Sequence, residues 1–461
     1  MKIKFSNLGS IKETELDLRP LTVIIGPNNS NKTYVAYCVY GILQQCSLSV
    51  DAPEEIDNLT SVMLWNKTVN DSIRQEVKHH SFEQLIYKEK NHELFLKIPK
   101  PNTAFRKTLT KIFNDKIRHF EEKLSIFFQD HSNKLFSKTC LSLLPESFNA
   151  LFNNAIPIFG VESIEEGITE ALIERIVKTL LPKPFLLPAE RNDLVLNYKM
   201  LNYRRFKLLE QTRRGSFNNN DNIQRQFELL RKSGDIRYQR PLEDLLNFLT
   251  DIDVQPDIKI DSANKNKFQK LADKIEKYIQ NNNKTVLKTN LLGGKEIKVN
   301  VKKGLSIDLY NASSSIKQLA SLLLYLRYRA KENDLLVIDE PEMNLHPESQ
   351  AKLLEVFGIL INLGVKVLIT THSPYFMDHL ESLVSGNTDN SKVIKKQAKA
   401  LYLKDSRAFI AFDKVSAYEM RDNQLHSLKD EDGDIRWDTL SDVSHELQSR
   451  YFQVYEKGKN V

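Results

Sequence analysis

The chain has 461 residues, of which 41% are hydrophobic and 27% charged, and its formal net charge is +6. This composition excludes a disordered chain and predicts a globular protein with packed cores. Three cysteines without a Cys-x-x-Cys pair exclude a disulfide framework and argue against a structural zinc site. Because there is neither a run of about 18 apolar residues nor a signal-peptide segment, we expect a cytoplasmic protein that makes no membrane contact.

The chain begins with two expected strands, at residues 2–8 and 13–20, joined by a short polar turn. A buried strand, LTVIIG, follows and ends at Gly26. The largely apolar stretch after Thr33, YVAYCVYGILQQC, lacks helix breakers and predicts a core helix. Residues 1–46 therefore read as strand, loop and helix in order.

The middle of the chain is expected to be mainly helical. Residues 47–182 are rich in Phe, Leu, Lys and Glu with helical periodicity, and they lack turn clusters at strand spacing, which predicts a helical insertion. The run FLLPAER at 185–191 is a short apolar segment stopped by Pro188. It opens a third segment, 183–285, which continues as a basic helical region with a loop at 215–222.

Basic residues concentrate between Arg191 and Arg240, where twelve Lys and Arg stand against five Asp and Glu. Interleaved arginines and aromatic residues of this kind could bind phosphates and stack on bases or on a protein partner. A solvated helix face would have the same composition, so both interpretations stay open. The candidate nucleic-acid or partner contacts are Arg204, Arg205, Arg213 and Arg214.

From residue 286 the pattern changes to strands. VLKTNLL, EIKVNV and LSIDLY are expected strands, with a turn at Gly293-Gly294, and SIKQLASLLLYLRYRA is an expected helix. Two buried strands, LLVIDE and VKVLITTH, flank a helix near ESQAKLLEVFGILINLG, and this alternation predicts a parallel, helix-covered sheet in 286–397. The tail, 398–461, is expected to form short strands at ALYL and AFIAF and then a polar helix.

The segment GPNNSNKT (26–33) has the spacing of a phosphate-binding P-loop, G-x-x-x-x-G-K-[ST], with Asn31 in place of the second glycine. Because it follows a buried strand and opens a helix, its backbone N–H groups are expected to bind an anion; a purely structural turn is the alternative. Asparagine tolerates a positive φ well, so Asn31 can serve there. We expect Lys32 to reach the β- and γ-phosphates of ATP and Thr33 to ligate Mg²⁺. The expected nucleotide-binding residues are Gly26, Pro27, Asn28, Asn29, Ser30, Asn31, Lys32 and Thr33.

Acidic and histidine side chains follow the two buried strands. In LLVIDEPE (335–342), Asp339 is expected to support the Mg²⁺ shell and Glu340 to orient or deprotonate the attacking water. His372 ends the next buried strand, at the sheet edge where open α/β sheets bind ligands, and is expected to touch the γ-phosphate. Lys32, Glu340 and His372 are thus the predicted catalytic residues.

The segments GPNNSNKT, LLVIDEPEMNLHP (335–347), ITTHSP (369–374) and FLLPAER resemble the ABC-type ATPases, in particular the RecF-like and OLD-like branch often described as AAA-family ATPases. The resemblance implies an α/β fold, an ABC-type P-loop NTPase head with a mixed sheet, helices on both faces and an antiparallel β subdomain. It covers both ends of the ATPase core, and not the insertion or most of the basic segment.

The same resemblance implies a composite site. ASSSIKQ (312–318) stands where the branch has its signature motif, usually LSSGEKQ, with Ser315 in place of glycine. Glu342–Pro347 would be the D-loop, and the segment around Glu190 and Arg191 would take the Q-loop role. A second copy of the chain, in a head-to-head dimer, would complete each nucleotide site with Ser313, Ser314, Ser315 and Asn344.

The sequence lacks the long heptad arms and Cys-x-x-Cys hook of Rad50-like relatives, and the residues after Ser373 are not organised as the TOPRIM domain of OLD nucleases. We therefore expect a stand-alone ATPase that serves as sensor or scaffold for a separately encoded effector such as a nuclease. The resemblance places such proteins in anti-phage defence. The alternatives are a RecF-like repair or recombination ATPase that binds duplex DNA, and a self-contained ATPase-gated nuclease toxin. Because Asn31 and Ser315 replace glycines, we expect slow hydrolysis.

Overall fold

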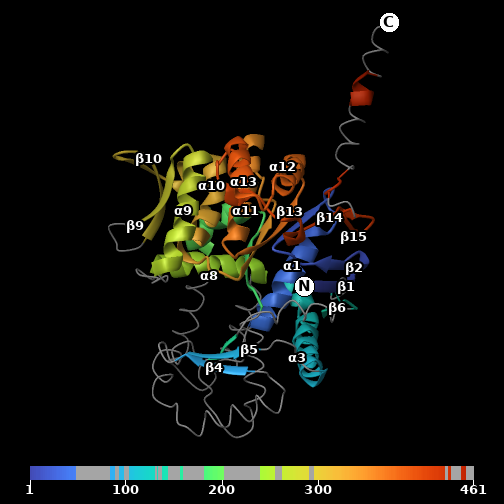
Figure 1. The fold of residues 1–461 in the computed structure, drawn as a ribbon. Coiled ribbons are helices and arrows are strands. Elements are labelled where there is room, and N and C mark those ends of the chain that lie inside the picture. The colour runs from blue at the N-terminus through green and yellow to red at the C-terminus, as the bar shows by residue number, and fades with distance from the viewer. Residues whose placement is uncertain are drawn as a thin grey trace, which may run out of the picture. The chain divides into compact units, whose positions relative to one another are not determined.

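Figure 1 shows the chain as a computed structural model. The chain folds into two compact units. The first unit consists of Met1–Leu18, Thr33–Leu186 and Asn333–Val337, and the second unit consists of Arg19–Lys32, Leu187–Glu332 and Ile338–Val461. Within the described residues no helix is long and apolar enough to cross a bilayer. The structure describes residues 1–47, 84–88, 93–97, 103–129, 132, 136, 138–143, 156–158, 181–201, 239–254, 262–289, 295–430, 434–437 and 448–452.

An antiparallel sheet opens the first unit. It consists of β1 (Lys2–Leu8), β2 (Ile11–Asp17) and β6 (Cys140–Leu143) in the order β2-β1-β6. Ile3, Phe5 and Leu8 of β1 are buried and the residues between them are not, as expected for a strand with one face toward a core. The hairpin of β1 and β2 confirms the predicted pair of strands.

The predicted core helix is α1 (Lys32–Ser47), which packs closely on α3 (Thr103–Glu122). A Cβ atom on Gly41 would lie 2.2 Å from the ring of Phe120, so a larger residue there would separate the two helices. The chain continues after α3 into the short helix α4 (Leu124–Phe127). Helix α1 therefore leads from its first residue, Lys32, into the core of the first unit.

The segment 47–182, which the sequence predicted to be helical, also contains strands. Besides α3, α4 and β6, its described residues include a three-stranded antiparallel sheet in the order β4-β5-β7. Its strands are β4 (Gln84–Lys88), β5 (Glu93–Lys97) and β7 (Ile156–Ile158). These strands are only three to five residues long, too short to give a clear alternating pattern beside the longer helical periodicity.

The central sheet has six strands in the order β15-β14-β3-β13-β12-β8. At its centre, β3 (Leu21–Ile25) lies parallel to both β13 (Lys366–Thr371) and β14 (Val415–Arg421). All five residues of β3 are buried, which explains its uninterrupted apolar sequence. Because the three strands are parallel and in register, their carboxyl ends meet at one edge of the sheet.

The remaining strands make the sheet mixed. All six residues of β12 (Asp334–Asp339) are buried, and β8 (Lys183–Leu187) is exposed only at its first residue. At the other edge, β15 (Gln424–Ser427) pairs antiparallel with β14 through a turn in which Asp422 and Asn423 have φ values of 52° and 58°. Two consecutive positive φ values are the requirement of a type I′ hairpin turn.

Helices and a separate antiparallel sheet complete the second unit. Helix α11 packs against α12, α9 and β13, and α10 packs against α9. The mixed sheet and the separate sheet β11-β10-β9 confirm the predicted α/β fold class. The elements are α8 (Arg240–Val254), α9 (Ser262–Tyr278), α10 (Ser314–Tyr328), α11 (Pro347–Asn362), α12 (Pro374–Ser385), α13 (Ser391–Gln397), β9 (Lys284–Thr289), β10 (Lys295–Lys302) and β11 (Leu305–Asp308).

The tail corrects one prediction, because ALYL (400–403) and AFIAF (408–412) are not strands. The fully buried carboxylate of Glu355 on α11 accepts the N–H groups of Tyr402 and Leu403, at 3.0 and 2.8 Å. Backbone donors held by a carboxylate cannot form a strand ladder. The strands of the tail are instead β14 and β15, and the described residues 448–452 of the predicted polar helix are helical.

Candidate functional site

The loop between β3 and α1 begins at a constrained glycine. Gly26 has a φ of 154°, and a Cβ atom there would lie 2.7 Å from the carbonyl oxygen of Met420 on β14. After it, Pro27, Asn28 and Asn29 are exposed, and α1 begins at Lys32. The first N–H groups of a helix have no partner within the helix, so this loop and helix start form a place where an anion can bind.

Asn31 adopts the backbone conformation that its position in the loop was expected to need. Its φ is 71°, and Asn29 has a φ of 60°, both in the left-handed region. The Asn31 side chain also donates a hydrogen bond to Asn423 Oδ1 at 3.0 Å, in the hairpin turn after β14. Asparagine therefore adopts the left-handed conformation at the position where the P-loop pattern has a glycine.

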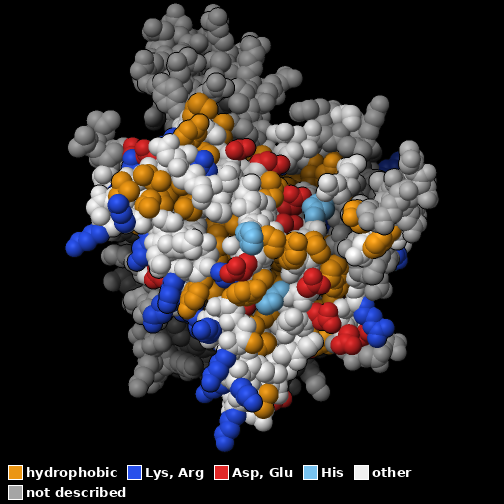
Figure 2. Space-filling view, turned by 90° about the horizontal axis from the view of Figure 1, so that it is seen from above, with side chains coloured by type: hydrophobic (Ala, Val, Ile, Leu, Met, Phe, Trp, Pro, Cys, Tyr) orange, Lys and Arg blue, Asp and Glu red, His pale blue; other side chains and the backbone are white. Residues whose placement is uncertain are grey.

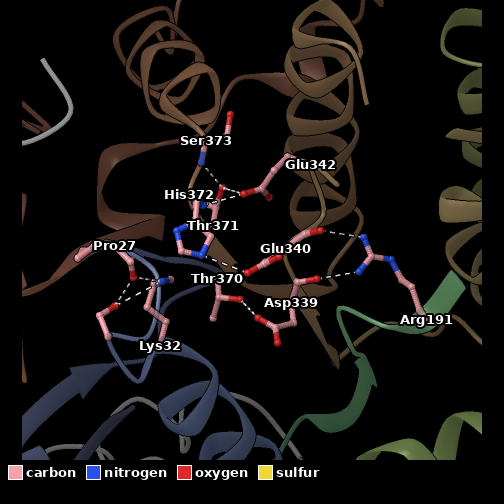
Figure 3. A network of polar contacts seen from close by, with 11 residues as sticks. Pro27, Lys32, Arg191, Asp339, Glu340, Glu342, Thr370, Thr371, His372 and Ser373 are labelled. Atoms are coloured by element: carbon pink, nitrogen blue, oxygen red, sulfur yellow. Dashed lines mark hydrogen bonds and ion pairs between the residues drawn. The ribbon is translucent and has the colours of Figure 1, made fainter. Parts of the chain in front are cut away.

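The ammonium group of Lys32 lies inside its own loop. Lys32 is 5% exposed, and its Nζ donates to Pro27 O at 2.7 Å and to Ser30 Oγ at 3.3 Å (Figure 3). Burial lowers its pKa to about 8, although the carboxylates of Glu340, Asp339 and Glu342 oppose this shift. Both hydrogen-bond acceptors of Lys32 Nζ are neutral oxygens, so the positive charge of Lys32 can attract an anionic ligand.

Glu340 follows β12 in an unusual backbone conformation. Its φ is 46°, in the left-handed region where a residue with a side chain costs about 1–2 kcal/mol. Its N–H donates to Thr370 O on β13 at 3.0 Å. The preceding residue, Asp339, is buried and accepts a hydrogen bond from the Thr370 hydroxyl. These bonds fix both acidic residues to the end of the neighbouring strand.

Arg191 holds the same backbone from the other side. Its guanidinium donates to Asp339 O at 2.7 Å, to Glu340 O at 3.0 Å and to Pro188 O at 2.9 Å, and the residue is 2% exposed (Figure 3). The sequence pointed to the segment around Glu190 and Arg191 for a different role, so this clamp was missed. Its sequence signal is an arginine that follows an apolar run and Pro188 within a few residues.

His372 faces the carboxylate of Glu340. Its Nε2 lies 3.1 Å from Glu340 Oε1, and both side chains remain partly accessible, at 28% and 32%. This hydrogen bond lowers the pKa of Glu340, and the positive charges of Lys32 and Arg191 act in the same direction, while burial opposes them. Glu340 is therefore a carboxylate at neutral pH and can accept a proton or orient a water molecule.

Glu342 is the residue that sequence reasoning placed only in the D-loop. Its Oε1 accepts hydrogen bonds from the Thr371 hydroxyl and from the His372 N–H, both at 2.7 Å. The last residue of the motif DEPE (339–342) was its signal. Glu342 thus contacts the backbone of the strand end that carries His372.

Four of the predicted residues therefore share one site: Lys32, Asp339, Glu340 and His372 (Figure 3). Thr33 is the next residue of α1, so a hydroxyl oxygen follows Lys32. A hydroxyl and a carboxylate are the hard oxygen donors that Mg²⁺ takes when phosphates and water supply its other ligands. The chemistry of Thr33 and Asp339 fits such an ion, although the described residues contain no group of three or more His, Cys, Asp or Glu that could hold a metal.

The other predicted residues lie outside this network. Helix α10 begins at Ser314, and its N-cap is Ser313, whose Oγ lies 3.1 Å from that of Ser315. Ser313, Ser314 and Asn344 are exposed. No hydrogen bond joins these residues to the loop before α1 in the described part of the chain. Arg204, Arg205, Arg213 and Arg214 lie outside the described residues.

The comparisons with known proteins give a family and distant folds. The AAA ATPase domain family matches residues 1–377, whereas no curated protein matches. An Smc head domain with an extended coiled coil from Pyrococcus furiosus, bound to the C-terminal domain of ScpA, has 11% identity and a TM-score of 0.35, with 98% of both chains covered. An Smc head bound to the C-winged helix domain of ScpA has 11% identity and a TM-score of 0.37, with 94% of this chain and 98% of that chain covered. The SMC head domain from Thermotoga maritima has 9% identity and a TM-score of 0.30, with 93% and 98% covered. At these TM-scores the likeness supports no further conclusion.

Proposed function

Because the chain belongs to the AAA ATPase domain family, we propose that it binds ATP with Mg²⁺ and hydrolyses it, slowly, as an ABC-type ATPase. One observation carries this proposal: the cation of Lys32, the carboxylates of Asp339 and Glu340 and the imidazole of His372 converge on the loop before α1. Phosphoryl transfer to water uses a cation to bind the phosphates and polar side chains to hold the metal ion and orient the water, and these four residues supply such groups.

Each residue has a distinct task in this proposal. The N–H groups of the loop and Lys32 bind the phosphates, and Thr33 and Asp339 would hold Mg²⁺, which would supply neutralisation of phosphate charge. Glu340 orients the attacking water and accepts its proton. It is in the ionised form that this task needs, because the hydrogen bond with His372 lowers its pKa. His372 holds the Glu340 carboxylate in place at 3.1 Å and lies where it can contact the γ-phosphate.

We propose further that two heads dimerise around the nucleotide. Ser313 and Ser314 at the start of α10 and Asn344 after β12 are exposed and have no bond to the site of their own chain within the described residues. The N-terminus of a 15-residue helix with exposed hydroxyls would suit the γ-phosphate of a nucleotide bound by a second copy. The resemblance to the RecF-like and OLD-like branch supports this arrangement.

Dimerisation is tested by measuring mass with and without a non-hydrolysable ATP analogue. We expect the 53.4 kDa chain to double its mass with the analogue. Ser313→Arg is expected to bind nucleotide and stay monomeric, because the long cation crowds the shared interface. Ser391→Arg, at the exposed start of α13, is the matched control and should dimerise normally. A wild-type chain that binds the analogue and remains monomeric at every concentration contradicts the proposal.

For the biological role, we propose a sensor or scaffold that works with a separately encoded effector such as a nuclease, in anti-phage defence. The support is the resemblance of the motifs to stand-alone members of the RecF-like and OLD-like branch. Co-purification from the native operon should recover a stable protein partner whose retention depends on ATP. Recovery of the ATPase alone, with and without ATP, would argue against this role.

A second candidate function, DNA binding as in a RecF-like ATPase, has one observation in its favour. A pocket of about 410 Å³ on β9, β10 and β11 is lined by four lysines and three polar residues, together with Val301, Gly304 and Leu305, and no carboxylate is among its lining residues. Asn300 stands opposite both Lys284 and Ser306, so phosphate-binding groups cross all three strands in one row. Lys and Arg side chains collect along the left side of Figure 2, the side on which β9 and β10 lie in Figure 1. The lining lysines are Lys284, Lys288, Lys302 and Lys303.

DNA binding through this pocket predicts a specific salt dependence. For each phosphate that the protein no longer neutralises, the slope of log affinity against log salt should fall by about 0.9. Lys284→Glu with Lys302→Glu should therefore reduce both the affinity for duplex DNA and this slope. Lys12→Glu, on the exposed face of β2, is the control and should leave both unchanged. Equal slopes for the wild type and the double variant would contradict DNA binding at this pocket.

A further inference from the structure

The carboxyl ends of β12 and β13 are joined by a carboxylate that the proposed catalytic roles do not use. Glu342 lies two residues after Glu340, and its Oε1 accepts the His372 N–H and the Thr371 hydroxyl, each at 2.7 Å. The Thr371 Oγ1 in turn accepts the N–H of Ser373 at 3.0 Å. A single oxygen of Glu342 therefore bonds to the last residue of β13 and to the residue after it, and the Thr371 hydroxyl bonds in turn to Ser373 (Figure 3).

His372 is consequently held from two directions. Its ring meets Glu340 Oε1 at 3.1 Å, and its backbone N–H meets Glu342 Oε1. Bonds to a charged acceptor are stronger than bonds between neutral groups, so the backbone bond has the strength to set where the ring lies. Glu342 therefore bonds to the backbone of the same residue whose ring meets Glu340.

Glu342 is half-buried, and one of its two carboxylate oxygens is shielded from water. Its Oε2 is buried and has no hydrogen-bond partner among the described residues. An isolated buried carboxylate oxygen is unfavourable, and a glutamine in the same place would leave no buried negative charge. What Glu342 contributes to the fold is therefore the pair of hydrogen bonds that its Oε1 accepts from Thr371 and His372.

We propose that Glu342 is a positioning residue, which sets the His372 imidazole against Glu340 and thereby links the segment Glu342–Pro347 to the reacting groups. The inference rests on the proposed ATP hydrolysis. If Glu342–Pro347 contacts a second copy of the chain, a movement of this segment on dimerisation reaches His372 through one hydrogen bond. Binding of the second copy would then change the position of His372 relative to the Glu340 carboxylate of the same head.

The test compares Glu342→Ala with Glu342→Gln. The glutamine amide oxygen can accept the two bonds that Oε1 accepts, whereas alanine accepts neither. We expect Glu342→Ala to lower kcat at least about 30-fold with KM within about threefold, because a reacting group misplaced by an ångström costs up to about 100-fold in rate. Glu342→Gln should stay within about fivefold of the wild-type kcat. The matched control is Glu348→Gln, an exposed carboxylate of α11 paired with Lys352, and it should match the wild type.

A second readout does not need turnover. In the nucleotide-free chain, the NMR signals of the His372 ring should shift in Glu342→Ala and stay in place in Glu342→Gln. An alanine variant with wild-type kcat and an unshifted ring signal overturns the positioning role, as does an alanine variant whose loss is entirely in KM. Absence of turnover in the wild type, with the ring shift still present, would remove the proposed hydrolysis and leave the contact between Glu342 and His372 established.

Discussion

Glu340→Gln is expected to lower the steady-state rate of ATP hydrolysis at least about 100-fold, because positioned general bases contribute about 10²–10⁴-fold. The wild-type carboxylate is ionised at neutral pH, since the hydrogen bond from His372 lowers its pKa. The amide has the same shape and keeps the contact with His372, but it cannot accept a proton from water. ATP affinity should therefore stay within a few-fold of the wild type.

Two measurements separate this outcome from a folding defect. The urea midpoint of Glu340→Gln should match that of the wild type, and a nucleotide titration should show that the ATP site is intact. Glu381→Gln, an exposed carboxylate on α12, is a control expected to hydrolyse ATP at the wild-type rate. Turnover by Glu340→Gln within threefold of the wild type would show that Glu340 is not the base.

The second large effect is expected from Arg191→Ala, which should destabilise the fold by about 3–5 kcal/mol and abolish hydrolysis. The guanidinium is the donor to the carbonyl oxygens of Pro188, Asp339 and Glu340, at 2.7–3.0 Å. Each buried carbonyl left without its donor costs about 1–3 kcal/mol. The left-handed backbone at Glu340 would also lose the bond that holds its carbonyl, so the carboxylate proposed as the general base would no longer face His372.

Arg191→Lys separates the effect of the planar guanidinium shape from the effect of the positive charge. A lysine keeps the positive charge near Glu340 but cannot present a planar fork to several carbonyls at once. We expect it to recover part of the stability and little of the activity. Arg407→Ala is the control, because this arginine is half exposed and paired with Asp405 near the surface, where the cost is about 1 kcal/mol or less. A urea midpoint of Arg191→Ala equal to that of the wild type would contradict the clamp.

The parts of the fold that the sequence predicted well are those in which burial alone determines the pattern. The runs LTVIIG, LLVIDE and VKVLITTH are continuous apolar segments because β3, β12 and β13 are buried throughout or almost throughout. The loop before α1 could also be predicted from the sequence, because an apolar strand, a loop that ends in Lys and Thr, and an apolar helix follow one another. The positive φ of Asn31 followed from the residue type.

The parts that could not be predicted depend on contacts between residues far apart in the chain. The apolar run that contains Tyr402 and Leu403 has the composition of a strand. The N–H groups of these two residues instead donate to the carboxylate of Glu355, nearly fifty residues earlier. Arg191 bonds to carbonyls 148 and 149 residues away, and Glu342 bonds to residues 29 and 30 positions later. No local pattern in the sequence reports such a bond.

The central proposal is a composite ATP-hydrolysing site, and it is tested most directly by phosphate release from ATP at increasing concentrations of the purified chain, with Mg²⁺ and with a chelator. We predict hydrolysis that requires Mg²⁺, disappears in Glu340→Gln and rises more steeply than the protein concentration, because Ser313 of a second copy completes each site. Hydrolysis strictly proportional to protein concentration from the lowest dilution, carried by a monomer, would contradict the composite site. Absence of both ATP binding and hydrolysis at every concentration would contradict the proposed function as a whole.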